Sequence, residues 1–192
     1  MQLAELQLKR ELKAIGKLNY GFGTELSNLL RERGWTVLGR GSEAAVAEHP
    51  SKPYVLKIYP TGSLYTKFVD LAQRVPQNPH FPKFSREQRK IPGTLFSYVR
   101  MEKLARVTEF DIKIEMPEAF CVAKQLYANL GQTLYWTNID KDVIECSSLS
   151  RDAEEVVQLM TRQLKKIGPR LDLHPLNIMR RGTVWVITDP YF

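Results

Sequence analysis

A short hairpin near the end of the chain constrains its fold more than any other feature. Apolar and β-branched residues lie on both sides of Arg181-Gly182, so the segment from Asn177 to Thr188 predicts two antiparallel strands joined by a tight turn. Asp172 precedes Asn177 in a D-x-x-x-x-N spacing, and Asp189 follows the second strand. The loop and the hairpin can thus bring two carboxylates and an amide oxygen together, and such oxygen atoms suit a Mg²⁺ ion.

The first half of the chain contains two closely spaced glycines and a lysine within a predicted strand. Gly39 and Gly41 would let the backbone turn tightly and bring its N–H groups to phosphate oxygens. Lys57 lies between Leu56 and Ile58, so on a strand its side chain points to the face opposite those two neighbours. Each feature has an ordinary alternative, a hairpin turn for the glycines and an exposed strand position for the lysine. Their order along the chain favours a phosphate site.

The remaining pattern predicts a chain with both helices and strands. Strands are expected at Trp35–Leu38, Ala45–Glu48, Tyr54–Tyr59 and Thr94–Met101. Helices are expected at Ser63–Val75, at Pro117–Leu130 and from about Ser150 to Ile167. In the last of these helices, acidic residues at the start and lysines at the end complement the helix dipole.

The order of these segments resembles that of the protein-kinase-like superfamily. Asp172-Leu-His-Pro-Leu-Asn177 is similar to the family's catalytic loop, and it is nearer to the form in aminoglycoside and choline phosphotransferases than to that in protein kinases. Thr188-Asp189-Pro190 stands at the family's metal-binding aspartate, whereas Arg170 occupies a position where the family usually has histidine. The chain also resembles the compact kinase-like proteins of bacteriophages. The resemblance implies an α+β, two-lobed protein-kinase-like fold, with an antiparallel sheet and a C helix in the N-lobe and a reduced helical C-lobe.

The resemblance also implies how the chain is divided. The expected parts are an N-terminal helical extension (residues 1–33), a kinase-like N-lobe (34–104), and a minimal C-lobe that holds the catalytic loop and the metal-binding aspartate (105–192). In the family, further chain follows the metal-binding aspartate, but here only Pro190-Tyr-Phe192 follows Asp189. We therefore expect the acceptor site to come from residues 105–150, from the extension or from another molecule.

The resemblance further implies that the chain binds ATP and Mg²⁺, and it assigns roles to individual residues. Lys57 would contact the α- and β-phosphates, and Asp172 would orient the acceptor hydroxyl. Asn177 and Asp189 would hold the metal. Asp70 is the candidate acidic partner of Lys57, with a solvated carboxylate on an amphipathic helix as an equally good interpretation. Other nucleotide contacts are implied at Gly39, Gly41, Ser42 and Val46, and beside adenine at Glu102 and Leu104.

Charge and composition indicate the class of ligand, the location of the protein and the state of its cysteines. The chain carries a net charge of +7 and 43% apolar residues, which suits a globular protein that handles polyanions. No apolar run is long enough to span a bilayer and the start lacks the pattern of a signal peptide, so we expect no membrane association and a cytoplasmic location. Cys121 and Cys146 form no Cys-x-x-Cys pair, and reduced thiols are expected.

Three classes of function fit this sequence. The first is an ATP- and Mg²⁺-dependent phosphotransferase that acts on a hydroxyl group, expected on a protein. The second is a kinase-like binding module that inhibits or scaffolds a partner protein without transferring phosphate. The third is a basic nucleic-acid-binding protein, although the clusters of lysine and arginine match no nucleic-acid motif and also fit a solvated surface.

Overall fold

The computed structural model describes residues 28, 30–40, 44–85, 87–91, 95–136, 144–146, 148–168 and 170–191. Most of the expected N-terminal extension therefore lies outside the described residues, as do Gly41 and Ser42. The chain divides into two compact units. Unit 1 holds residues up to Thr66 together with Phe84–Lys103, and unit 2 holds Lys67–Lys83 together with Leu104–Phe192.

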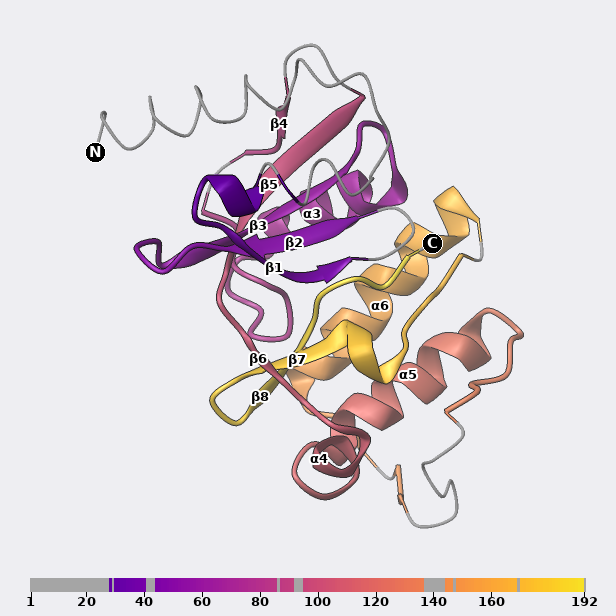
Figure 1. The fold of residues 1–192 in the computed structure, drawn as a ribbon. Coiled ribbons are helices and arrows are strands. Elements are labelled where there is room, and N and C mark those ends of the chain that lie inside the picture. Colours follow the sequence, from indigo (N-terminus) through magenta and orange to yellow (C-terminus); the bar gives the residue numbers. More distant parts are fainter. Residues whose placement is uncertain are drawn as a thin grey trace. The chain divides into compact units, whose positions relative to one another are not determined.

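Unit 1 is built on a five-stranded antiparallel sheet in the order β1-β2-β3-β5-β4 (Figure 1). Its strands are β1 Thr36–Arg40, β2 Ala45–Glu48, β3 Tyr54–Pro60, β4 Arg89–Lys90 and β5 Phe96–Glu102. Helix α3, Leu64–Arg74, has its first turn in this unit. One face of the sheet packs into an apolar core of Leu30, Trp35, Ala47, Leu56, Ile58, Ile91 and Tyr98. Side chains alternate along a strand, so Lys57 points to the other face, as the sequence predicts.

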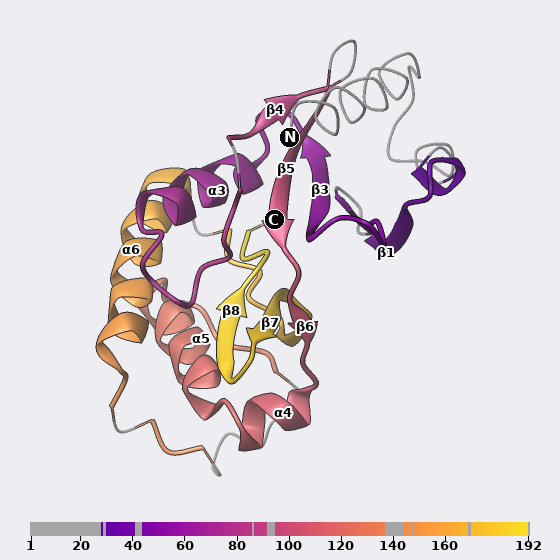
Figure 2. The same ribbon diagram turned by 90° about the vertical axis from the view of Figure 1, so that its left-hand side faces the viewer.

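Unit 2 combines helices with a small antiparallel sheet (Figure 2). Its helices are α4 Glu109–Ile114, α5 Pro117–Asn129, α6 Arg151–Ile167 and the 3-10 turn η1 Pro175–Asn177, and it also contains the rest of α3. The sheet consists of β6 Ala105–Arg106, β7 Ile178–Arg181 and β8 Val184–Ile187. The hairpin predicted from the sequence is confirmed. Arg181 pairs with Val184 across a turn at Gly182, whose φ of +61° suits glycine because it has no side chain to clash.

Helix α6 begins and ends where its sequence predicts. The Ser150 hydroxyl accepts a hydrogen bond from the Ala153 amide at 3.3 Å and so caps the first turn. Gly168 follows the last turn with a φ of +95°, which ends the helix. The buried face consists of Ala153, Val156, Val157, Met160 and Leu164. This face contacts α5, so the two helices pack as a pair.

The two cysteines form a disulfide, and the expectation of reduced thiols is wrong. Cys121 lies on α5 and Cys146 lies just before α6, and their Cα atoms are 5.5 Å apart. That distance is typical of a disulfide. Sequence spacing gave no sign of it, because the two residues are separated by 25 positions and meet only when the chain leaves α5 and returns to α6.

The described chain is thus α+β with antiparallel sheets, as expected from the sequence. Within the described ranges, none of the helices has the length and apolar character needed to cross a membrane. The expected boundaries at residues 33 and 104 stay predictions.

Candidate active site

In unit 1, the register of the sheet aligns three of the expected nucleotide contacts. Gly39 on β1 lies opposite Val46 on β2, Val46 lies opposite Lys57 on β3, and Lys57 lies opposite Val99 on β5. Directly opposed residues in antiparallel strands share a face of the sheet. Gly39, Val46, Lys57 and Val99 therefore form one cross-strand row on the face opposite the apolar core.

Lys57 is buried beneath an aromatic ring of α3. Its side chain is only 3% exposed, and its Nζ lies 3.9 Å from the centroid of the Tyr65 ring. The Tyr65 hydroxyl in turn reaches Met101 Sδ at 4.0 Å. An ammonium over a ring face is attracted to the π electrons, and the attraction is stronger away from water. The sequence gave no signal for this pair.

Three further residues expected to bind the nucleotide or to pair with Lys57 are Glu102, Leu104 and Asp70. Glu102 is half-buried at the end of β5, where it pairs with Tyr54, and Leu104 is half-buried just beyond that strand. Asp70 lies on α3 with an exposed side chain. Its pairing with Lys57 stays a prediction.

In unit 2, backbone hydrogen bonds join the predicted catalytic loop to the end of the hairpin. The Asp172 amide donates to the Pro190 carbonyl at 2.7 Å, and the Thr188 amide donates to the Asn177 carbonyl at 2.8 Å. The Thr188 hydroxyl donates to the same carbonyl at 3.0 Å. Asp189 lies between Thr188 and Pro190. The main chain therefore fixes it on both sides to the two loop residues with which the sequence predicts it to act.

The donor atoms in this loop fit Mg²⁺. Asn177 Nδ2 donates to the Asp172 carbonyl at 2.7 Å and lies 3.4 Å from Asp172 Oδ2, so Asn177 Oδ1 is the atom of this amide that could bind a metal ion. Asp189 adds a half-buried carboxylate, whereas Asp172 is exposed. Among the described residues, no group of three or more His, Cys, Asp or Glu side chains could hold a metal. An amide oxygen with one or two carboxylates is the smaller donor set that Mg²⁺ uses beside phosphates.

Side chains from outside the loop hold its carbonyl groups. The indole Nε1 of buried Trp136 donates to the Leu173 carbonyl at 2.8 Å, and the Tyr127 hydroxyl donates to the Leu171 carbonyl at 3.4 Å. Burial raises the pKa of Tyr127, and the negative charge of Asp172 raises it further. Within the loop, His174 Nδ1 accepts from the Leu176 amide at 3.3 Å and caps η1. These bonds fix the path of the loop.

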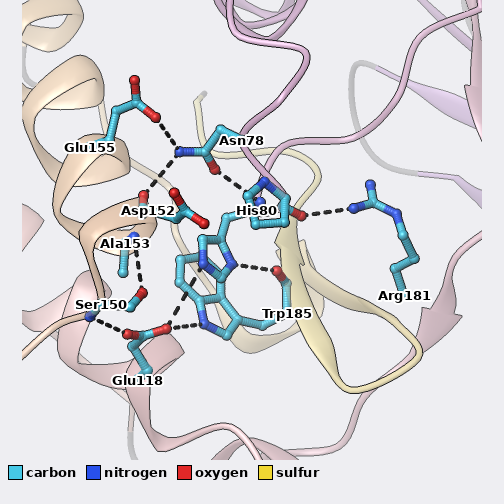
Figure 3. Close-up of polar contacts among 10 residues, drawn as sticks. Asn78, His80, Glu118, Ser150, Asp152, Ala153, Glu155, Arg181 and Trp185 are labelled. Carbon is cyan, nitrogen blue, oxygen red and sulfur yellow. Dashed lines mark hydrogen bonds and ion pairs between the residues drawn. The ribbon is translucent and has the colours of Figure 1, made fainter.

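A polar cluster around buried His80 supports the hairpin (Figure 3). The His80 ring stacks on Trp185 with centroids 3.6 Å apart, and its Nδ1 donates to the Trp185 carbonyl at 3.0 Å. The His80 carbonyl accepts from the Ile187 amide at 3.0 Å. Strand β8 is therefore anchored to the segment after α3, and this strand leads directly to Asp189.

The same cluster reaches both long helices of unit 2. Glu118 on α5 accepts from Trp185 Nε1 at 3.0 Å and from the Ser150 amide at 2.6 Å. Asn78 Nδ2 donates to the Asp152 carbonyl at 3.0 Å and to Glu155 Oε2 at 2.8 Å. Sequence reasoning missed this cluster, because its members come from four separate segments of the chain (Figure 3).

Two groups in the cluster have shifted pKa values. Burial lowers the pKa of His80, although its bond to Trp185 and the charge of Glu118 oppose the shift. Burial would raise the pKa of Glu118, but its hydrogen bonds from Ser150 and Trp185 lower it below the usual value. His80 Nε2 lies 3.9 Å from Glu118 Oε2. The depressed His80 value favours a neutral ring that supports the fold.

A cavity of about 620 Å³ in unit 2 lies beside the disulfide. It is lined by Cys121, Lys124, Gln125, Ala128, Cys146, Ser148, Leu149, Glu154, Val157 and Gln158. None of these belongs to the predicted catalytic loop or the cross-strand row. Residues 137–143 and 147, which neighbour part of the lining in sequence, lie outside the described residues, so we assign no ligand to the cavity.

Comparison with known proteins gives a partial similarity to a solved kinase domain. No family model matches the sequence, and no curated protein matches it. The Mycobacterium tuberculosis PknI kinase domain aligns with a TM-score of 0.34 and 14% identity over 81% of this chain and 58% of that chain. A double mutant of the same domain aligns with a TM-score of 0.35 and 15% identity, over 81% and 59% of the two chains. The chain thus spans less than two thirds of these domains, and at such scores we transfer no residue role from them.

Proposed function

We propose that this chain is an ATP- and Mg²⁺-dependent phosphotransferase that transfers a γ-phosphoryl group to a hydroxyl group, with a protein side chain as the acceptor. The observation that carries the proposal is the main-chain linkage of Asp172 and Asn177 to the two residues that flank Asp189. Phosphoryl transfer depends mainly on positioning and on neutralising the charge of the phosphoryl oxygens. Main-chain bonds that join the segments carrying Asp172, Asn177 and Asp189 support that task.

The row in unit 1 supports the nucleotide half of the proposal. Gly39 adds no side chain beside the phosphates, Val46 offers an apolar contact to the base, and Lys57 supplies a positive charge. Gly41 and Ser42 would add backbone N–H groups, and Glu102 and Leu104 would contact adenine through their backbones. In this proposal, residues 34–104 and 105–192 act as two lobes, with α3 as the C helix.

The chemistry assigned to the residues is simple. The Asp172 carboxylate accepts the hydroxyl proton as the acceptor oxygen bonds to the γ-phosphorus and the bond from that phosphorus to the β–γ bridging oxygen breaks. Lys57 binds the α- and β-phosphates. Asn177 and Asp189 would hold Mg²⁺, which when bound neutralises charge on the phosphates.

A thermal shift assay with ATP and Mg²⁺ tests nucleotide binding. A ligand that binds only the folded chain raises its apparent melting temperature, and Asp189→Asn should abolish the rise. Glu154→Gln is the matched control, since it removes one negative charge from an exposed position of the same unit and should keep the rise. The absence of any shift in the wild type at millimolar nucleotide would refute the proposal.

One observation favours a second candidate function, a kinase-like module that binds nucleotide without transferring phosphate. Arg170 is exposed where the family resemblance expects a histidine that packs the loop. Transfer of label from γ-labelled ATP to protein, compared between wild type and Asp172→Asn, separates the two functions. Label that depends on Asp172 supports the enzyme, whereas a thermal shift without transfer supports the binding module.

A further inference from the structure

Lys57 lies in a small aromatic cluster in which every member has a defined contact. The Tyr65 ring lies over Lys57 Nζ at 3.9 Å and meets Tyr59 edge-on with centroids 4.8 Å apart. Tyr59 donates its hydroxyl hydrogen to Gln88 Oε1 at 2.7 Å, and Gln88 Nε2 donates to the Thr66 carbonyl at 3.1 Å. Because Thr66 follows Tyr65 on α3, this chain of bonds holds the ring above the lysine.

Burial makes the ring contact important. Lys57 and Tyr65 are 3% and 5% exposed, so water does little to stabilise the ammonium. A ring face stabilises such a cation without contributing a negative charge. The ring therefore restricts where the positive charge of the ammonium points.

We propose that Tyr65 is a positioning residue that holds the Lys57 ammonium, through the face of its ring, where it binds the phosphates of the nucleotide. The inference rests on the proposed function, because it needs a phosphate ligand. The hydroxyl of Tyr65 has a separate task. Its contact with Met101 Sδ at 4.0 Å ties α3 to the strand that ends at Glu102.

Three variants separate the ring face from the rest of the side chain. Tyr65→Phe keeps the ring and loses only the hydroxyl. Tyr65→Leu removes the ring face but keeps an apolar side chain. Tyr98→Leu is the matched control, since Tyr98 is 6% exposed on the same sheet but belongs to the apolar core on its other face. Tyr98→Leu should lower stability without disturbing Lys57.

The contact itself is tested without nucleotide. Lysine labelled with ¹³C at Cε gives NMR signals for each Lys Hε pair, and Lys57→Arg identifies the Lys57 signal by its loss. The ring current of Tyr65 should shift this signal upfield in the wild type, in Tyr65→Phe and in Tyr98→Leu. The shift should disappear in Tyr65→Leu. An unshifted wild-type signal would overturn the inference.

The positioning role is tested by calorimetric titration with ATP and Mg²⁺. Tyr65→Leu should weaken nucleotide affinity by about 5- to 30-fold, the range expected for a cation–π contact between exposed and buried settings, while Tyr65→Phe stays within about twofold of the wild type. An upfield Lys57 signal with unchanged affinity in Tyr65→Leu overturns the inference alone. An upfield signal in a wild type that binds no ATP instead refutes the proposed function, and the positioning role falls with it.

Discussion

The two units hold their candidate functional groups in opposite ways. In unit 1, Lys57 is buried and is surrounded by packed side chains, so its position depends on the neighbouring aromatic rings. In unit 2, the Asp172 side chain is exposed, and the main chain fixes its loop through bonds at 2.7 and 2.8 Å. Substitutions should therefore affect fold and function together at Lys57 but separately at Asp172.

The largest expected effect tests whether function can be lost at Asp172 without a loss of stability. Asp172→Asn keeps the size of the side chain and all main-chain bonds of the loop but removes the carboxylate that we propose accepts the proton. We expect turnover to fall by about 100- to 10,000-fold, because general-base catalysis contributes in that range. The free energy of unfolding should change by less than about 0.5 kcal/mol, as is usual for exposed positions. A large loss of stability in urea unfolding would contradict the comparison.

The disulfide offers a test of stability confined to unit 2. Replacing both Cys121 and Cys146 by serine frees a loop with a sequence separation of 25. Loop-closure entropy predicts a loss of about 3.5 kcal/mol in the free energy of unfolding. Hydrogen exchange should report the loss at amides of α5 and α6 and not at amides of β3. A reducing agent should give the same loss in the wild type and none in the double variant.

A smaller effect is expected for the indole of Trp136, which supports the predicted catalytic loop. Trp136→Phe keeps an aromatic ring next to Phe120 but removes the N–H that donates to the Leu173 carbonyl. A buried carbonyl left without its donor costs about 1 to 3 kcal/mol. Chemical unfolding should show this cost, and turnover should fall as the loop loses its anchor. Tyr127→Phe, which removes the longer bond of 3.4 Å to Leu171, should cost less.

The smallest effect is a pH dependence that also belongs to unit 2. Burial lowers the pKa of His80 from its ordinary value of 6.5, so below about pH 6.5 the unfolded chain binds more protons than the folded one. The His80 contribution to stability is therefore complete above that pH and decreases as the pH falls. Thermal unfolding between pH 7 and pH 5 should show the decrease, and His80→Gln should reduce it.

Glu118, the carboxylate of the cluster with a shifted pKa, does not account for a change in stability between pH 7 and pH 5. The pKa of Glu118 lies below its ordinary value of 4.5, so its contribution is lost only as the pH falls through that lower value. Asp152 and Arg181 also act on the pKa of His80, with opposite signs, because Asp152 raises it and Arg181 lowers it. A pH response as large in His80→Gln as in the wild type would assign the effect to other groups.

The parts of the fold that sequence could predict are those fixed by neighbours in the chain. Alternation around Lys57 gives the strand and its face, Ser150 and Gly168 give the ends of α6, and the Gly182 turn gives the hairpin. Each depends on residues close in sequence, where propensities and caps act.

The features of the fold that sequence could not predict depend on contacts between segments that are far apart in the chain. His80 and Trp185 are 105 positions apart, and Trp136 and Leu173 are 37 apart. The Cys121–Cys146 pair falls in the same class. For Lys57, sequence drew attention to a carboxylate at Asp70, yet the ring that lies over its ammonium belongs to Tyr65, five residues nearer the start of α3. Such contacts depend on which side chains the folded backbone brings together, and no local pattern encodes them.

The pairing of β1 with β2 determines where a residue can be deleted without changing the register of the sheet. Val37 lies opposite Ala47 and Gly39 lies opposite Val46, so Leu38 is an extra residue in β1. Deletion of Leu38 would leave Gly39 aligned with Val46, whereas deletion of one residue within β2 would move the later residues of that strand to the opposite face of the sheet. A residue can therefore be lost at Leu38 while Gly39 keeps its register with Val46 and, through Val46, with Lys57.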